Sequence, residues 1–270
     1  MSDRVVVTIE DGVADVRLNR PEKMNALDAA MFAALTETAH GLRNEPGVRV
    51  VVLSGEGRAF CAGLDFDNFK GMASDGDRSD SGPAIQIVDG RITSDGQEAV
   101  YAWTALEVPV IAAVHGVALG GGLQLALGAD LRIVAPDARM SVLEIRWGLV
   151  PDMTGTPVLP TLVGIDVAKE LAFTGRMVEG TEAAVIGLAT RVADDPRAEA
   201  LELAADIAVK SPDAIRGTKV LLDMAGRASL SESFAAEAKI QSELIGSPNQ
   251  VESVTAYFEQ RAPVFTDPTG

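Results

Sequence analysis

The sequence has very few of the residues that build disulfides and metal sites. Its 270 residues include one cysteine and two histidines. One cysteine rules out an internal disulfide, and so few sulfur and imidazole ligands argue against a zinc site, so we expect no bound metal. Basic residues are also fewer than acidic ones, with 23 Lys and Arg against 39 Asp and Glu. Because phosphate backbones are bound by clustered positive charge, the net charge of −16 argues against a broad nucleic-acid surface.

Several common sequence patterns are missing as well. The chain contains no G-x-x-x-x-G-K-[ST], no G-x-S-x-G and no G-x-G-x-x-G after a strand, which excludes a P-loop, a hydrolase elbow and a dinucleotide fingerprint. The most apolar stretch, Val108–Ala129, contains Pro109 and a glycine run and is followed by Asp130. We expect it to form a buried strand, a turn and a short buried helix rather than a membrane span. Met1–Val7 lacks the apolar core of a signal peptide, so we expect a cytoplasmic protein.

Hydrophobic patterning predicts an α/β fold. Val5–Ile9 and Val13–Leu18 flank Glu10-Asp11-Gly12 and predict a hairpin. Continuous apolar runs predict buried strands at Val48–Leu53, Val108–Val114 and Leu131–Ala135. Apolar residues at three- and four-residue steps predict helices, which we place at Asp28–Arg43, Gln97–Glu107, Thr154–Val163, Val167–Thr174, Pro196–Lys210, Pro212–Ala225, Leu230–Ile245 and Asn249–Arg261, with another that begins at Thr181–Ile186.

The order of these elements suggests two regions. Residues 1–195 contain the predicted strands, and residues 196–270 form a helix-rich C-terminal region, so we expect a boundary near residue 195. Within the first region, Gly71–Gly96 is small, polar and charged. Such a segment buries too little apolar area to offset its ordering entropy, so we expect a mobile loop there.

Two glycine-containing loops follow buried strands and are candidates for chemistry. The first is Gly57–Asp65, and the second is His115–Gly122, which ends in three successive glycines. Gly121 and Gly122 are expected at the N-terminus of a helix, where amide N–H groups lack partners and favour negative charge. If the loops meet, each offers one N–H group to a developing oxyanion. The alternative interpretation is a pair of tight turns that serve packing only.

Two carboxylates stand close together in the sequence. Glu144 precedes Asp152 by eight residues, and the intervening Gly148 and Pro151 predict a chain reversal. A reversal brings both carboxyls to one cleft as an acid/base pair. The alternative is structural: Asp152 as a helix N-cap, and Glu144 as an ion-pair partner of a nearby arginine.

Five segments in this order resemble the crotonase superfamily, the enoyl-CoA hydratase/isomerase family. They are Arg17–Leu27, Arg58–Asp65, Ile111–Gly122, Glu144–Asp152 and the C-terminal Tyr257–Phe265. The resemblance implies a spiral core of ββα turns with a C-terminal helical trimerisation region, so a homotrimer or a dimer of trimers is expected. It also implies an acyl-CoA thioester substrate and a role in fatty acid metabolism, with coenzyme A carried by the substrate and no further cofactor.

The resemblance assigns candidate site residues. The two amides that hold the thioester enolate correspond to Leu64 and Gly121, and the catalytic carboxylates to Glu144 and Asp152. Coenzyme A is expected against the loops that contain Lys23, Ala62, Asp65, Phe66 and Lys70.

Departures from the family pattern bear on the reaction. Hydratases of this family carry a second glutamate where this chain has Gln124, and usually a glycine where it has Asp152. A glutamine neither takes up nor releases a proton near neutral pH. A Glu and an Asp at these two positions resemble the dienoyl-CoA isomerase branch, so we expect isomerisation of a double bond in an unsaturated acyl-CoA. The alternatives are hydration that uses Glu144 alone and an acyl-CoA binder without activity.

Overall fold

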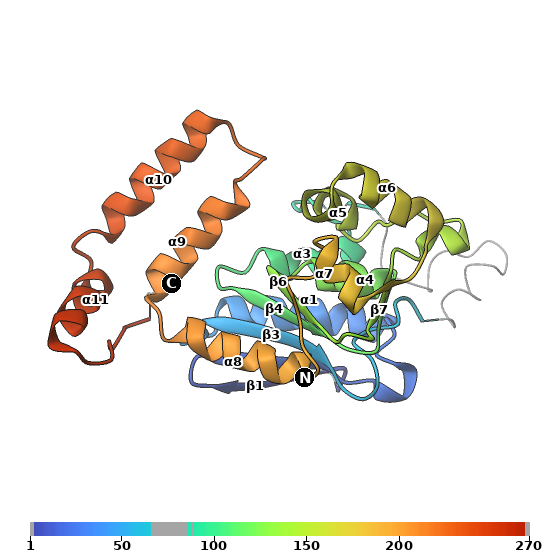
Figure 1. The fold of residues 1–270 in the computed structure, drawn as a ribbon, viewed down its shortest axis with the longest axis horizontal. Coiled ribbons are helices and arrows are strands. Elements are labelled where there is room, and N and C mark those ends of the chain that lie inside the picture. Colours follow the sequence, from blue (N-terminus) through green and yellow to red (C-terminus); the bar gives the residue numbers. More distant parts are fainter. Residues whose placement is uncertain (1–2, 66–85, 88, 268–270) are drawn as a thin grey trace.

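The computed structural model describes residues 3–65, 86–87 and 89–267, and its core is a six-stranded sheet in the order β1-β2-β3-β4-β6-β9 (Figure 1). The predicted hairpin is confirmed: β1 and β2 are antiparallel, with Val5 opposite Leu18. The neighbouring pairs that follow are parallel. The strands are β1 (Val5–Glu10), β2 (Val13–Leu18), β3 (Val50–Gly55), β4 (Val110–Val114), β6 (Leu131–Val134) and β9 (Arg191–Val192).

Helices cover both faces of this sheet, which is why β3 and β4 are continuously apolar. Side chains alternate between the faces, so Val51 and Leu53 of β3 join the main core cluster, whereas Val50 and Val52 join a second, smaller one. The main cluster contains buried side chains of α1 (Ala29–Arg43), α3 (Asp95–Thr104) and α4 (Gly121–Leu127). The second is completed by alanines of α8 (Pro196–Ala208), which lies across the strands.

A second sheet lies beside the first and carries the segments that form the cavity described below. Its order is β5-β7-β8, with strands β5 (Val117–Leu119), β7 (Arg139–Ser141) and β8 (Val178–Glu179). Strand β7 leads into a 3-10 helix, η2 (Glu144–Trp147). After a loop the chain continues as α5 (Gly155–Val163), α6 (Ile165–Thr174) and, beyond β8, α7 (Gly180–Val185).

The residues after 195 differ in how they pack. Helix α8 lies on the main sheet, whereas α9 (Pro212–Asp223), α10 (Leu230–Leu244) and α11 (Pro248–Glu259) extend away from it (Figure 1). Helix α9 is anchored by Lys219, whose Nζ donates to Asp130 Oδ2 at 2.8 Å and to the Val108 carbonyl at 3.0 Å. The predicted division at residue 195 stays a prediction. Within the described residues, no helix is both long and apolar enough to cross a bilayer.

The helix predicted at Gln97–Glu107 begins earlier, at Asp95. Ser94 and Gln97 form a capping box, in which the Ser94 side chain accepts from the Gln97 backbone and the Gln97 side chain accepts from the Ser94 backbone. The C-terminal end of the predicted loop Gly71–Gly96 is therefore helical. Residues 71–85 and 88 of that loop lie outside the described residues, as do Phe66 and Lys70.

Candidate active site

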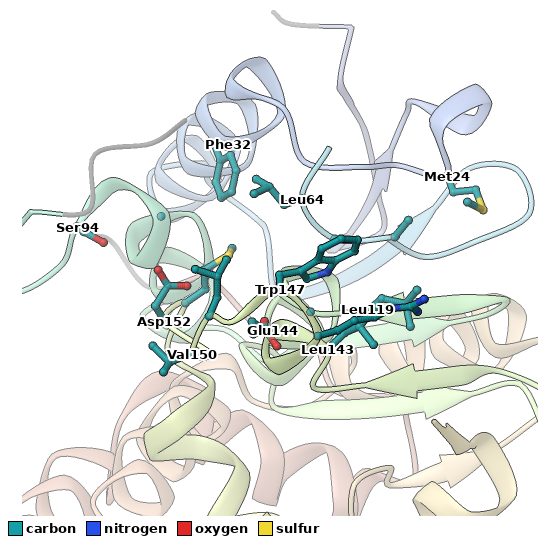
Figure 2. Close-up of a pocket in the computed structure, with 18 of the residues that line it drawn as sticks. Met24, Phe32, Leu64, Ser94, Leu119, Leu143, Glu144, Trp147, Val150 and Asp152 are labelled. Carbon is teal, nitrogen blue, oxygen red and sulfur yellow. The ribbon is translucent and has the colours of Figure 1, made fainter. Parts of the chain in front are cut away.

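A cavity of about 440 Å³ opens between the two glycine loops and the segment after β7. Its walls are mainly apolar, with Glu144 and Asp152 among the few polar groups (Figure 2). The described lining residues are Met24, Phe32, Ala62, Gly63, Leu64, Ser94, Gly96, Leu119, Gly120, Gly121, Leu143, Glu144, Arg146, Trp147, Leu149, Val150, Asp152, Met153 and Met177. The predicted catalytic residues Leu64, Gly121, Glu144 and Asp152 thus line one cavity.

The first glycine loop is held on both sides by backbone hydrogen bonds. Cys61 exchanges two with β5: its N–H donates to the Val117 carbonyl and its carbonyl accepts from Leu119. On the other side, Leu27 donates to the Gly63 carbonyl at 2.8 Å, and Asp65 donates to the Leu27 carbonyl at 3.0 Å. Among the described residues, no group accepts a hydrogen bond from the Leu64 N–H.

The second glycine loop begins helix α4. Gly120 has a φ of +51° and donates its N–H to the Ser141 carbonyl at 2.9 Å, which fixes the turn. Gly121 is the first helical residue, so its N–H has no partner one turn earlier, and within the described chain no other acceptor takes it. The sequence prediction of an unpaired amide at this position is therefore consistent with the structure.

The two loops are in van der Waals contact at Gly63. This residue has a φ of +84°, and a Cβ atom placed on it would lie 2.4 Å from the Leu119 carbonyl oxygen and 3.7 Å from the Gly121 nitrogen. Only glycine fits such a position, because it has no Cβ and adopts left-handed backbone angles without cost. The contact brings Leu64, the next residue, and Gly121 to the same wall of the cavity.

Glu144 is buried at the start of η2, next to the second glycine loop. A Cβ on Gly120 would lie 3.3 Å from its Oε1 atom, so the carboxyl lies directly beside the turn that presents the Gly121 N–H. Oε1 accepts a hydrogen bond from Gln124 Nε2 at 2.6 Å, whereas Oε2 is buried and has no partner in the described residues. Burial raises the pKa of the Glu144 carboxyl, hydrogen bonds from its own backbone and from Gln124 lower it, and the charge of Asp152 raises it further.

Asp152 reaches the cavity after the predicted chain reversal. Gly148 ends η2 with a φ of +69°, and Leu149 donates back to the Glu144 carbonyl at 3.1 Å. Asp152 is exposed in the single chain, and the partial burial of its carboxyl raises the pKa of that group. In Figure 2 it lies toward the same end of the cavity as Val150 and Ser94.

Neither carboxylate has the purely structural role that the sequence offered as an alternative, a helix N-cap for Asp152 and an ion pair for Glu144. The N-cap of α5 is Thr154 rather than Asp152. Among the described residues, Glu144 makes no ion pair with an arginine, and its side-chain partner is the neutral amide of Gln124. Neither carboxyl therefore has the expected structural role, and both residues line the cavity, which is where acid/base chemistry needs them.

Of the residues expected to contact coenzyme A, some lie at or beside the cavity, one is buried in an ion pair, and two lie outside the described residues. Ala62 lines the cavity, and Lys23 lies exposed in a 3-10 turn directly before Met24, which also lines it. Asp65 is buried, and its Oδ2 atom accepts from Arg20 at 2.5 Å. The structure therefore gives the Asp65 carboxylate a part in holding the loop, and its expected contact with coenzyme A stays a prediction. Phe66 and Lys70 lie outside the described residues.

Several functional candidates could not be read from local patterns. Phe32 of α1, Ser94 and Gly96 at the start of α3, and Met177 before β8 all line the cavity, yet they are far apart in the sequence. Cys61, in contrast, lies within a glycine loop but is fully buried and donates to the Asn25 carbonyl at 3.2 Å. Burial raises the pKa of its thiol to about 12, so it is not a nucleophile near neutral pH. In the part of the chain that the structure describes, no cluster of three or more His, Cys, Asp or Glu residues is arranged for a metal ion.

Comparisons with known proteins identify the family. The family model for enoyl-CoA hydratase/isomerase matches residues 8–268. The human mitochondrial enoyl-CoA hydratase domain-containing protein 2 is 35% identical over 269 residues, covering 97% of this chain and 88% of that protein. Mouse mitochondrial methylglutaconyl-CoA hydratase is 31% identical over 93% of this chain and 79% of its own length.

Solved structures give the same result. An enoyl-CoA hydratase from Bacillus anthracis has a TM-score of 0.87 and 30% identity, covering 97% of this chain and 99% of that one. An enoyl-CoA hydratase from Mycobacterium tuberculosis has a TM-score of 0.84 and 31% identity over 98% of this chain and 99% of that one. With a family model that matches nearly its whole length and relatives of this similarity, the chain belongs to the enoyl-CoA hydratase/isomerase family, whose members act on acyl-CoA substrates.

Proposed function

We propose that this enzyme isomerises a double bond in an unsaturated acyl-CoA, using Glu144 and Asp152 to move the proton. The observation that carries the proposal is the pair of carboxyls along one apolar cavity, next to two unpaired amides. The surroundings of the carboxyls differ: Glu144 accepts a hydrogen bond from Gln124, whereas no described side chain donates to Asp152. Such a difference separates the roles of two nearby acids.

The amides of Leu64 and Gly121 are proposed to hold the thioester oxygen. Loss of a proton from C2 turns the thioester into an enolate, and the negative charge gathers on this oxygen. Donors already in place stabilise that charge with little reorganisation, and one such donor is worth about 2.7–4 kcal/mol in comparable sites. The Gly63 contact fixes the spacing of the two loops before the substrate arrives.

The position of each carboxyl suggests its step. Glu144 lies beside Gly120, hence beside the proposed oxygen site, so it is the group nearest C2. Ionised Glu144 removes the C2 proton, and the electron pair moves into the thioester oxygen. Protonated Asp152, further along the cavity, then gives its proton to a remote carbon of the chain as the electrons return and the double bond shifts. Proton exchange with solvent restores both carboxyls.

Hydration is the second candidate. Relatives of this chain are named hydratases, and the Oε2 atom of Glu144 has no partner in the described residues, which leaves it able to activate a water molecule. In this reaction Glu144 acts alone, because Gln124 has no proton to exchange near neutral pH. Asp152 then has no chemical part.

Deuterium exchange and product analysis separate these functions. The parent, Glu144→Gln and Asp152→Asn proteins are incubated in D2O with a 3-enoyl-CoA, a 3,5-dienoyl-CoA and crotonyl-CoA. Isomerisation predicts that Asp152→Asn still exchanges the C2 hydrogen but forms at least about a hundredfold less isomer, and that Glu144→Gln does neither. Rapid hydration of crotonyl-CoA that is insensitive to Asp152→Asn contradicts the isomerase. Binding with no turnover of any thioester supports an acyl-CoA binder instead.

We also propose that the C-terminal helices are covered by further copies of the chain. Helix α10 has no buried residue in the single chain, and exposed apolar side chains on and after α9 include Val220, Leu222, Leu230, Phe234, Tyr257 and Phe258. Light scattering is expected to give three or six chain masses, and Phe234→Glu a smaller species. A monomeric parent protein contradicts this assembly.

A further inference from the structure

Gln124 is a buried amide that does not line the 440 Å³ cavity itself but contacts Glu144, which does, and it has a partner at each end of its side chain. Only 2% of the residue is exposed. Its Oε1 atom accepts from the backbone N–H groups of Met153 at 2.8 Å and Gly155 at 3.0 Å, and its Nε2 donates to Glu144 Oε1 at 2.6 Å. One neutral side chain of α4 thus connects Glu144 to the loop that carries Asp152.

The backbone around Thr154 forms a cradle for the oxygen of Gln124. Thr154 has a φ of +71°, a left-handed conformation that is unusual for a residue with a branched Cβ. This conformation directs the N–H groups on either side of Thr154 at one atom, in the manner of the concave backbone sites that bind oxygen anions. Strained residues of this kind persist where the surrounding structure requires them.

The cradle decides the orientation of the amide. Two N–H donors point at the same atom of Gln124, so that atom must be the oxygen, and the amide nitrogen has to face Glu144. Nitrogen donates and cannot accept, so the contact with Oε1 is always a hydrogen bond to the carboxylate. It holds Oε1 in place and leaves Oε2, which has no described partner, as the oxygen that is free to exchange a proton.

The charged groups described around Glu144 do not favour its ionised form as the hydrogen bond from Gln124 does. Asp152 and Arg146 line the same cavity, and the charge of Asp152 raises the pKa of Glu144. Helices α4 and α5 and strand β5 carry no titratable side chain, and Arg139 of β7 is exposed. On α6, which packs against η2, the charged residues Asp166, Lys169 and Glu170 are all exposed. Of the side chains near Glu144, Gln124 is the donor that favours its ionised form.

We propose that Gln124 is a positioning residue. It selects Oε2 of Glu144 as the proton-transferring oxygen, and it holds Glu144 in place relative to the loop that carries Asp152. The proposal rests on the proposed function only for its catalytic consequence. The geometry itself is independent of whether the substrate is isomerised or hydrated.

The most direct test is titration of Glu144 without substrate, by carbon-13 NMR of Glu-labelled protein, with Glu144→Gln identifying the signal. Gln124→Met removes the donor, so Glu144 is expected to titrate at a higher pH than in the parent. Gln124→Glu keeps an oxygen in the cradle but places a second carboxyl against Oε1, so the pair shares a proton and the upward shift is larger. Gln250→Met is the matched control, because Gln250 also accepts from a backbone N–H, that of Gly246, but lies away from the cavity.

A second variant tests the cradle without changing Gln124. A Cβ on Gly155 would lie 2.8 Å from Gln124 Oε1, so Gly155→Ala pushes the amide out of place. It is expected to shift the Glu144 titration in the same direction as Gln124→Met. Thr154→Gly keeps the left-handed conformation and is expected to titrate like the parent.

Activity adds an independent readout. With Gln124→Met, the acid limb of kcat/KM is expected to move to higher pH, with about a tenfold loss on that limb and a smaller loss on the plateau. A purely structural role lowers kcat/KM equally at every pH. A folded Gln124→Met protein whose Glu144 titrates as in the parent overturns the proposal. If Gln124→Met shifts the Glu144 titration upward as expected, but the parent protein turns over no thioester, only the proposed function is refuted.

Discussion

Substitution of Gly63 by alanine tests the contact on which the proposed oxyanion site depends. The new Cβ would lie 2.4 Å from the Leu119 carbonyl oxygen, about 1 Å inside ordinary van der Waals contact. The two glycine loops have to move apart, and Leu64 and Gly121 then no longer reach one oxygen. Loss of one donor in such a site lowers kcat by about 10²- to 10³-fold.

The control separates this effect from the strain of a left-handed alanine, which costs about 1–2 kcal/mol by itself. Gly246 has a φ of +78°, close to the +84° of Gly63, and a Cβ there meets no atom within 4 Å. Gly246→Ala is therefore expected to lose similar backbone stability and keep the parent kcat. Steady-state kinetics and thermal unfolding of both variants give the comparison. A folded Gly63→Ala protein with the parent kcat refutes the proposed pair of amides.

Three further predictions follow from single contacts. Lys23→Glu is expected to raise the KM for acyl-CoA by about threefold to tenfold, with a smaller effect on kcat, because it reverses an exposed charge beside the cavity. Equal changes in both constants contradict this. Lys219→Met leaves Asp130 without its buried cation and is expected to lower the free energy of unfolding by about 3 kcal/mol. The exposed Lys239→Met is its control, and equal denaturant midpoints contradict the anchor. Cys61, with a pKa near 12, is expected to resist iodoacetamide at pH 8 while the protein is folded. Because burial raises the pKa of this thiol from its ordinary value of 9.0 to about 12, the folded protein loses stability as pH rises from 9 toward 12. A thiol that reacts readily at pH 8 contradicts its burial.

The sequence predicted the elements that bury a regular face. Helix α1 and the helices from α8 onward begin and end within a few residues of their predicted bounds, and the buried β3 and β4 were recognised as continuous apolar runs. The short strands β5, β7, β8 and β9, of two or three residues, were not predicted, because so few residues show no periodicity. Of these, β5 and β7 position the two glycine loops and η2.

The site was predictable only where chemistry and local chain geometry coincide. The reversal between Glu144 and Asp152 was visible in Gly148 and Pro151. The role of Gln124 was not, because its partners Met153 and Gly155 lie about thirty residues away and donate through their backbones. The Arg20 contact of Asp65 is similarly non-local. Such contacts depend on how loops cross in space, and no side-chain pattern records that.

The measurement that bears most directly on the central claim is the carbonyl stretch of a bound acyl-CoA labelled with carbon-13 at the thioester carbon, recorded by isotope-edited infrared spectroscopy. Two amides on one oxygen weaken the C=O bond. A lower stretching frequency is therefore expected for the bound thioester than for the free one, with recovery toward the free value in Gly63→Ala. A bound thioester that absorbs at the free frequency in the parent protein contradicts it.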